Sequence, residues 1–265
     1  MNSIEKVKAG DAHLAVAVAG TGAALLLVHG FPLDRTMWRQ LEGTDGWMRI
    51  APDLRGAGQS DVPASGYTMT RYADDLVAVL DALGARRAVC CGLSMGGYIL
   101  FELWRRYPER IRALILCDTK SEADTAEGKR GRDELAATAR DAGVGAVAER
   151  LVPKLVGRTT RAENPALVET VRTMVQRSPV AGVVGALQAM RDRADATPRL
   201  VEVAVPTLIV VGAEDELTPP AVVRPMVDRI PGARYAEIPG AGHLAPLERP
   251  GPFNSAVAEF LSILE

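Results

Sequence analysis

A serine and three glycines stand between an apolar, strand-like run and a helix-like run, and this junction constrains the fold most strongly. Residues 90–100 read CCGLSMGGYIL, with the serine at position 94. Glycine weakens both helices and strands, so glycines at such a junction need a structural reason. Without Cβ atoms at Gly92 and Gly96, a strand and a helix can close tightly on each other. The pattern therefore predicts a strand, a sharp turn that presents Ser94, and a helix.

Strand-like and helix-like runs alternate along most of the chain. Apolar runs that indicate strands cover 24–30, 47–53, 87–92, 111–118, 206–215 and 233–239, after an N-terminal hairpin within 4–18. Helical spacing of apolar residues covers 70–83, 95–107, 219–230 and 253–264. Strand–helix alternation of this kind predicts an α/β fold with a mostly parallel, doubly wound sheet.

One long region lacks this alternation of strands and helices. From about residue 120 to residue 199 there is no strand signal, and the composition is rich in Ala, Arg, Glu and Asp. Helical patterns lie at 144–156 and 180–193. A structureless loop of this length inside a domain would be unusual. We expect an inserted all-helical cap at 120–196, with the α/β core formed by 1–119 and 197–265.

The net charge, the length of the apolar runs and the cysteine spacing argue against several classes of function. The formal net charge is −2, so no basic face for nucleic acid is expected. No apolar run approaches the roughly 18 residues that a membrane span needs, and no secretory signal is recognisable at the N-terminus. The three cysteines lie in apolar runs without metal-ligand spacing. These features predict a cytoplasmic protein without metal, cofactor, nucleic-acid or membrane partner.

A serine nucleophile needs a base, and the chain contains only three histidines. Chemistry in parallel α/β sheets gathers at the carboxyl ends of strands. His13 lies within the N-terminal hairpin, whereas His29 and His243 follow strand-like runs. The Gly- and Pro-rich loop PGAGHLAP favours His243 as the base, and His29 is interpreted as a structural residue held by backbone hydrogen bonds.

The carboxylate that orients the base is sought at the same strand ends. Asp215 ends the run TLIVVGAED, and the chain order Ser94, Asp215, His243 is the Ser–Asp–His order expected for a serine nucleophile on such a turn. Asp118, at the end of the preceding strand, is the second candidate. Asp53 is interpreted as a support for the loop DLRGAGQS.

Acyl transfer also needs two N–H groups aimed at the developing oxyanion. The N–H of Met95, next after the nucleophile, is one candidate. Because Pro32 has no N–H, Phe31 is the best second donor in the loop after the run 24–30. Phe31, Met95, Leu217 and Leu244 lie near these positions in the sequence, and we expect them to line the substrate pocket.

The motifs HGFPLD, DLRGAGQS, GLSMGG, GAEDELTP and GAGHLAPLERP together resemble the successive signature loops of the α/β-hydrolase superfamily. The chain most resembles small cap-bearing carboxylesterases, 3-oxoadipate enol-lactonases and cofactor-free haloperoxidases. A serine rather than an aspartate at position 94 argues against the haloalkane dehalogenase and epoxide hydrolase branches. The resemblance implies a serine hydrolase that cleaves small to medium carboxylic esters or lactones through an acyl-enzyme, without a cofactor.

Several alternatives remain open from the sequence. Enol-lactonase activity would require recognition of a substrate carboxylate, for which the helical region offers Arg130, Arg132, Arg140, Arg150, Arg158 and Arg161. These arginines alternate with acidic residues, which favours a solvated helix face. Perhydrolysis, carbon–carbon bond hydrolysis and a non-catalytic protein of the same fold are further possibilities. The expected partner is a small-molecule ester or lactone, and the oligomeric state is left open.

Overall fold

An eight-stranded sheet forms the centre of the molecule in the computed structural model, which describes residues 3–264. The strand order is β1-β2-β4-β3-β5-β6-β7-β8. Strands β3 to β8 are parallel, whereas β1 and β2 add an antiparallel hairpin at one edge. The bounds are β1 Ser3–Ala9, β2 Ala12–Ala19, β3 Ala23–Val28, β4 Trp47–Pro52, β5 Ala88–Leu93, β6 Ile111–Cys117, β7 Thr207–Gly212 and β8 Arg234–Ile238. The predicted mostly parallel sheet is confirmed.

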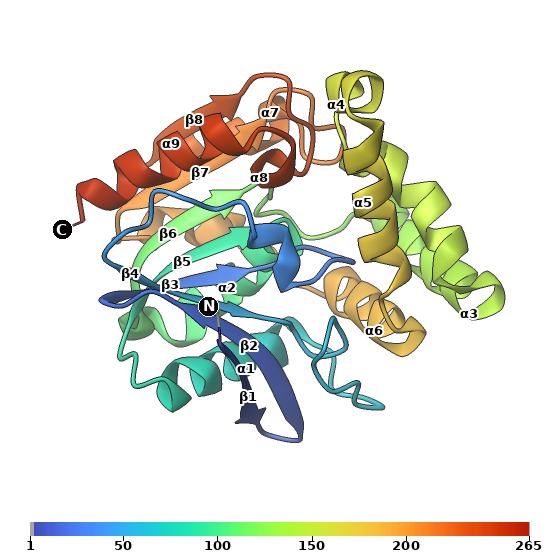
Figure 1. Cartoon of the computed structure of the whole chain (residues 1–265), viewed down its shortest axis with the longest axis horizontal. Coiled ribbons are helices and arrows are strands. Elements are labelled where there is room, and N and C mark those ends of the chain that lie inside the picture. The colour runs from blue at the N-terminus through green and yellow to red at the C-terminus, as the bar shows by residue number, and fades with distance from the viewer. Residues whose placement is uncertain (1–2, 265) are drawn as a thin grey trace.

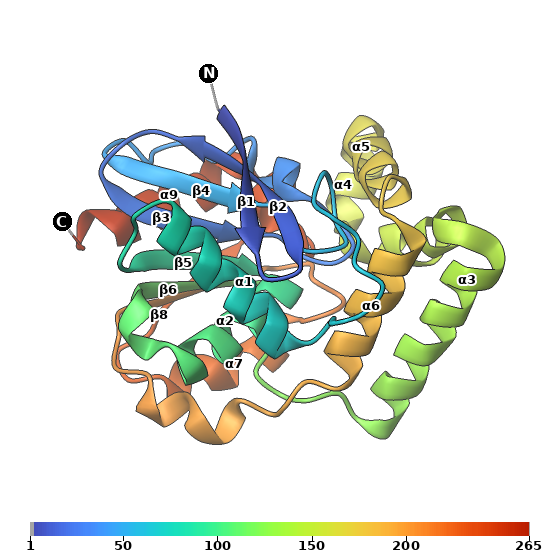
Figure 2. The same ribbon diagram turned by 90° about the horizontal axis from the view of Figure 1, so that it is seen from below.

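Helices cover both faces of this sheet, as expected for a doubly wound fold (Figures 1 and 2). Helices α1 (Met69–Ala82), α2 (Met95–Arg106) and α7 (Pro220–Arg229) lie on one face. Helix α9 (Pro250–Ser262) lies on the other face, near the short helices η1 (Arg35–Trp38) and α8 (Ala245–Glu248). The strand–helix order that the sequence predicted is therefore present in the fold.

Helix α1 illustrates how the sequence specifies an element. The side chain of Thr68 accepts a hydrogen bond from the N–H of Arg71, which satisfies one of the free donors at the helix start. Tyr72, Leu76 and Val79 recur at helical spacing and are buried against the sheet domain. The central strand β5 is buried along its whole length, which explains its continuous apolar sequence.

Four α-helices and the short helix η3 (Thr197–Glu202), but no strand, lie between β6 and β7 in the described chain. The four α-helices are α3 (Ala126–Leu155), α4 (Arg158–Glu163), α5 (Pro165–Gln176) and α6 (Val180–Arg191), here called the helical segment. Both views place them beyond the arrowheads of the parallel strands, at the carboxyl edge of the sheet (Figures 1 and 2). Helix α3 is interrupted at Gly143, which has φ 77° and ψ 175°, so the predicted pattern 144–156 corresponds to its second half.

Two short helices complete the chain, η2 (Pro108–Arg110) before β6 and η3 (Thr197–Glu202) before β7. Within residues 3–264, none of the helices combines the length and the apolar character needed to cross a bilayer.

Candidate active site

Ser94 lies between the last residue of β5 and the first residue of α2. Its backbone has φ 53° and ψ −112°, a left-handed conformation that is strained for a residue with a Cβ atom. A Cβ atom on Gly96 would lie 2.3 Å from the carbonyl oxygen of Val28, so glycine lets α2 approach β3 closely. Met95 is the first residue of α2, where a backbone N–H has no acceptor within the helix. The turn therefore holds Ser94 beside a free helix N-terminus.

Asp215 and His243 form a buried pair. The distance between His243 Nδ1 and Asp215 Oδ2 is 2.8 Å, and their side chains are 3% and 0% exposed. Asp215 Oδ2 also accepts from Thr218 Oγ1 at 2.6 Å, while Oδ1 accepts from the N–H groups of Leu217 and Thr218 at 2.8 and 3.0 Å. Burial alone would raise the pKa of Asp215, but His243 and the Thr218 donors hold that pKa below its ordinary value. The carboxylate is thus stabilised in its charged form and fixed toward the imidazole.

Topology brings these residues to one edge of the sheet. Ser94 follows β5, Asp118 follows β6, Asp215 follows β7 and His243 follows β8. These four strands are parallel neighbours in the sheet order, so their carboxyl ends lie side by side. Because Nδ1 of His243 faces Asp215, Nε2 is the ring nitrogen left to act on another group. A serine, a histidine and a carboxylate at one sheet edge are the side chains that acyl transfer on a serine requires.

His29 is held in a different way. Its Nδ1 lies 2.9 Å from the carbonyl oxygen of Gly30, and its Nε2 accepts from the N–H of Leu54 at 3.0 Å. These contacts assign the proton to Nδ1 and engage both ring nitrogens. Burial also lowers the pKa of His29, which keeps the ring neutral. His29 therefore joins two loops as a structural residue, as the sequence indicated.

Asp118 is fully buried and has no comparable contact with a histidine in the described structure. Its Oδ1 accepts from the N–H of Gly212 at 2.8 Å, whereas Oδ2 has no hydrogen-bond partner within residues 3–264. Burial, and to a smaller extent the nearby Asp215, raise the pKa of Asp118 well above its ordinary value. A carboxyl group in this state is poorly suited to stabilise an imidazolium. The geometry favours Asp215.

A cavity between the sheet domain and the helical segment is lined in part by Met95, the residue that follows Ser94. It has an empty volume of about 270 Å³, and its walls include Phe31 and Met95. The walls also contain the polar side chains of His29 and Arg55, and residues that the sequence analysis did not single out: Leu33, Leu54, Tyr72, Ser178, Val183 and Ala186. Those from 178 onward come from α6 and the residues just before it. The lining is mostly apolar, which suits the hydrocarbon part of a small substrate.

The structure places the four predicted pocket residues in different surroundings. Phe31 and Met95 line the cavity, and the peptide bond between Phe31 and Pro32 is cis. Leu217 and Leu244 are not among its lining residues. Leu217 is 38% exposed in the turn after Asp215, whereas Leu244 is fully buried.

The arginines of residues 120–196 that could hold a substrate carboxylate lie elsewhere. None of the six named from the sequence lines the cavity that Phe31 and Met95 line. Arg132 pairs with Asp124 at 3.0 Å, and Arg161 pairs with Glu216 at 3.2 Å. In the described part of the chain, no three His, Cys, Asp or Glu side chains gather as a metal site requires.

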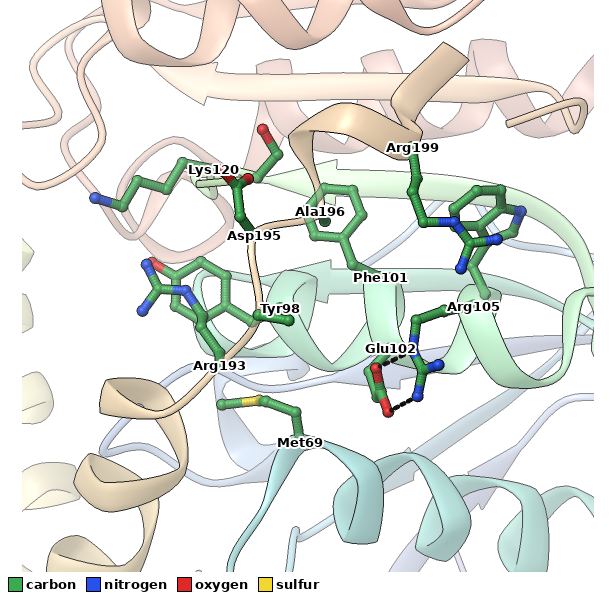
Figure 3. Close-up of a pocket in the computed structure, with 13 residues that line it drawn as sticks. Met69, Tyr98, Phe101, Glu102, Arg105, Lys120, Arg193, Asp195, Ala196 and Arg199 are labelled. Atoms are coloured by element: carbon green, nitrogen blue, oxygen red, sulfur yellow. Dashed lines mark hydrogen bonds and ion pairs between the residues drawn. The ribbon is translucent and has the colours of Figure 1, made fainter. Parts of the chain in front are cut away.

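A second cavity lies along α2, and its lining residues include none of Ser94, Asp215 and His243. Its empty volume is about 480 Å³, and it is lined by aromatic and charged side chains. Figure 3 shows the guanidinium of Arg193 stacked on the ring of Tyr98, with 4.1 Å between the guanidinium carbon and the ring centroid. Arg105 in the same view is bound to Glu102. These two arginines therefore have partners inside the protein, and none of the residues proposed for chemistry lines this cavity.

Comparisons with known proteins identify the fold family of the chain and several similar proteins. Residues 23–250 match the family model described as alpha/beta hydrolase fold. A thermophilic esterase from Thermogutta terrifontis, solved with malate bound, is 39% identical, covers 100% of this chain and 99% of its own, and has a TM-score of 0.94. The 3-oxoadipate enol-lactonase 2 of Acinetobacter baylyi is 27% identical over 88% of this chain and 86% of its own length. A Mycobacterium tuberculosis protein named as a non-heme bromoperoxidase is 32% identical over 82% of this chain and 84% of its own.

Proposed function

The chain belongs to the alpha/beta hydrolase fold family, and from this premise we propose that it hydrolyses small to medium carboxylic esters or lactones through an acyl-enzyme on Ser94. The observation that carries the proposal is the buried pair of Asp215 and His243, with 2.8 Å between Oδ2 and Nδ1, at the sheet edge that also presents Ser94. The esterase and enol-lactonase relatives support the same class of reaction.

The proposed first half-reaction is acylation. His243 Nε2 takes the proton of the Ser94 hydroxyl while Oγ forms a bond to the carbonyl carbon. The oxygen of the tetrahedral intermediate carries the negative charge and accepts hydrogen bonds from the N–H groups of Phe31 and Met95. The bond to the leaving oxygen then breaks, and His243 returns the proton to that oxygen. Asp215 keeps the imidazole in the required tautomer and stabilises its cationic form.

Deacylation repeats the sequence with water. His243 removes a proton from a water molecule, whose oxygen attacks the acyl carbon, and the bond to Ser94 Oγ breaks as the proton returns to it. The product is a free carboxylic acid, and the enzyme is restored. In this proposal residues 120–196 act as a cap, because α6 contributes lining residues to the same cavity as Met95, which follows the proposed nucleophile.

An activity assay and a labelling experiment test this proposal. p-Nitrophenyl acetate and butyrate should be hydrolysed, and a fluorophosphonate probe should label Ser94 alone, as located by peptide mass spectrometry. Ser94→Ala should lose both. A wild-type protein that turns over neither ester, or that is labelled at another residue, would contradict the proposal.

The relative named as a non-heme bromoperoxidase supports perhydrolysis as a second candidate activity. It would use the same acyl-enzyme, with hydrogen peroxide in place of water as the attacking molecule. Acetate, peroxide and bromide should then brominate monochlorodimedone at a rate that depends on Ser94. A panel of acyl esters and lactones measured beside this assay would rank the two activities.

A further inference from the structure

Glu248 is a buried carboxylate at the end of α8 that binds three backbone N–H groups. It is 4% exposed. Its Oε1 accepts from Gly242 at 3.0 Å and from Leu244 at 3.1 Å. Its Oε2 accepts from Gly157 at 2.7 Å. Gly242 and Leu244 flank His243, whereas Gly157 joins α3 to α4 in the helical segment.

From these contacts we infer that Glu248 is a positioning residue, which fixes the backbone on both sides of His243 and ties that loop to the helical segment. The inference rests on the proposed role of His243 as the base. The backbone of this loop sets where the imidazole stands, because the ring is carried by the peptide between the two bound N–H groups. Hydrogen bonds to an ionised acceptor are about twice as strong as neutral ones, so one side chain can hold both segments.

Backbone packing around Glu248 makes this connection close. A Cβ atom on Gly242 would lie 2.2 Å from the backbone nitrogen of Gly157. A Cβ atom on Gly212, at the end of β7, would lie 2.0 Å from the carbonyl oxygen of Gly242. Strand β7, the His243 loop and the helical segment therefore meet backbone to backbone. A shift of the helical segment at Gly157 would be transmitted to the loop that carries the base.

The residue next to Asp215 binds the same part of the helical segment. Glu214 accepts from the N–H and the Oγ1 of Thr159 at 2.8 and 2.6 Å. The loops that carry the proposed acid and the proposed base thus each place a carboxylate on residues 157–159. This second contact supports the inference that the helical segment and the two loops are held in a fixed position relative to one another.

Glu248→Gln is the decisive variant because it keeps the shape and changes the hydrogen-bonding pattern. A glutamine has one acceptor oxygen and one NH₂ group, which is a donor. If the oxygen faces Gly242 and Leu244, the NH₂ opposes the N–H of Gly157. If the oxygen faces Gly157, the NH₂ opposes the two N–H groups beside His243. Either orientation leaves at least one buried donor without an acceptor.

Two readouts separate positioning from general stability. Because small displacements of a catalytic group cost up to about 100-fold in rate, kcat for p-nitrophenyl butyrate should fall about 10- to 100-fold while KM changes less than about 3-fold. Hydrogen–deuterium exchange should become faster in peptides that cover 239–245 or 155–159. Glu259→Gln is the matched control, since it makes the same change in α9 at a side chain that is 78% exposed. The control should match the wild type in both readouts.

The outcomes are distinct. An active Glu248→Gln protein with the kcat of the control overturns the inference, and so does unchanged exchange in both peptides. If the wild type hydrolyses no ester and Ser94 is not labelled, the proposed function fails, and the exchange data still decide whether Glu248 holds the loop. If the variant does not fold, exchange in the wild type decides: fast exchange at Gly242 and Leu244 would overturn the inference.

Discussion

Replacing Asp215 by asparagine tests the proposed acid without changing its shape. The two oxygens of Asp215 have different partners. Oδ1 accepts two backbone N–H groups, from Leu217 and Thr218, and Oδ2 lies 2.8 Å from Nδ1 of His243. The amide oxygen of Asn keeps both backbone bonds only at the Oδ1 position, which turns its NH₂ group toward Nδ1. Nδ1 must then accept, so the ring proton moves to Nε2, and Nε2 can no longer take the proton of Ser94.

The structure also gives the size of the effect. Turning the amide around restores the active tautomer but sets its NH₂ against two backbone N–H groups. Two lost hydrogen bonds at about 1–2 kcal/mol each amount to about 2–4 kcal/mol. At 1.36 kcal/mol per factor of ten, this leaves the active orientation about 30- to 1000-fold less populated. Loss of the negative charge beside the imidazolium lowers the rate further, so we expect a loss of up to about 10⁴-fold.

The assay is kcat/KM for p-nitrophenyl butyrate, measured across pH, with Ser94→Ala as the background. Asp118→Asn is the matched control, because it makes the same chemical change one strand away and should retain activity within a few-fold. Thermal unfolding confirms that both variants fold. An Asp215→Asn enzyme that keeps more than about a tenth of wild-type activity would refute the reasoning, and a large loss in Asp118→Asn alone would move the acid to that residue.

Three further variants test the strain at the turn, the buried carboxyl and the buried ion pair. The free energy of unfolding of Ser94→Gly should be about 1 kcal/mol larger than that of Ser94→Ala, because glycine adopts the positive φ of this position without strain. Thermal denaturation of the two variants measures this difference, and equal values would contradict the prediction. Burial raises the pKa of Asp118 well above its ordinary 3.8, so the folded state holds a proton that the unfolded state has released, and stability from this group falls as pH rises above 3.8 toward the folded-state pKa. Asp118→Asn should therefore gain stability over the wild type across that rise, as urea unfolding from pH 4 to pH 8 would show; a constant difference would contradict it. Asp75→Asn removes the buried carboxylate that binds Arg55, where the two side chains are 0% and 1% exposed, and leaves that guanidinium the more exposed Asp11 at 3.2 Å as a carboxylate partner. The cost should be about 3 kcal/mol in the same measurement.

Most of the fold could be predicted from the sequence because the central strands are buried on both faces of the sheet. Runs such as ALLLV and LIVVG are continuous and apolar, and each ends in or near glycine. The helical segment was harder to interpret. The first half of α3 buries mainly Leu135, Ala136 and Ala139, and small side chains give a weak periodic signal. Helix α5 carries a clearer pattern in Leu167, Val171 and Met174, which are spaced as a helix requires and could have been found.

For the candidate site, local motifs carried most of the information. Ser94, Asp215 and His243 each stand in a short motif at the end of a predicted strand, so topology alone brought them to one edge. Ser178 and Ala186 lack such a motif, and they reach the cavity only because the helical segment folds back over the sheet edge. Leu217 and Leu244 are not in the lining of this cavity, and their contact with substrate stays a prediction, since nearness in sequence does not fix where a side chain points.

The contact between Gly157 and Gly242 has a consequence for exchanging substrate specificity between relatives. A transplanted helical segment would begin after β6 and end before β7, two neighbouring strands, so the sheet order could stay intact. The graft would still have to present a backbone N–H to Glu248 through a position that has no room for a side chain. Compatibility of a chimera therefore depends on this contact, and a glycine matched to position 157 is a property to select in a donor sequence.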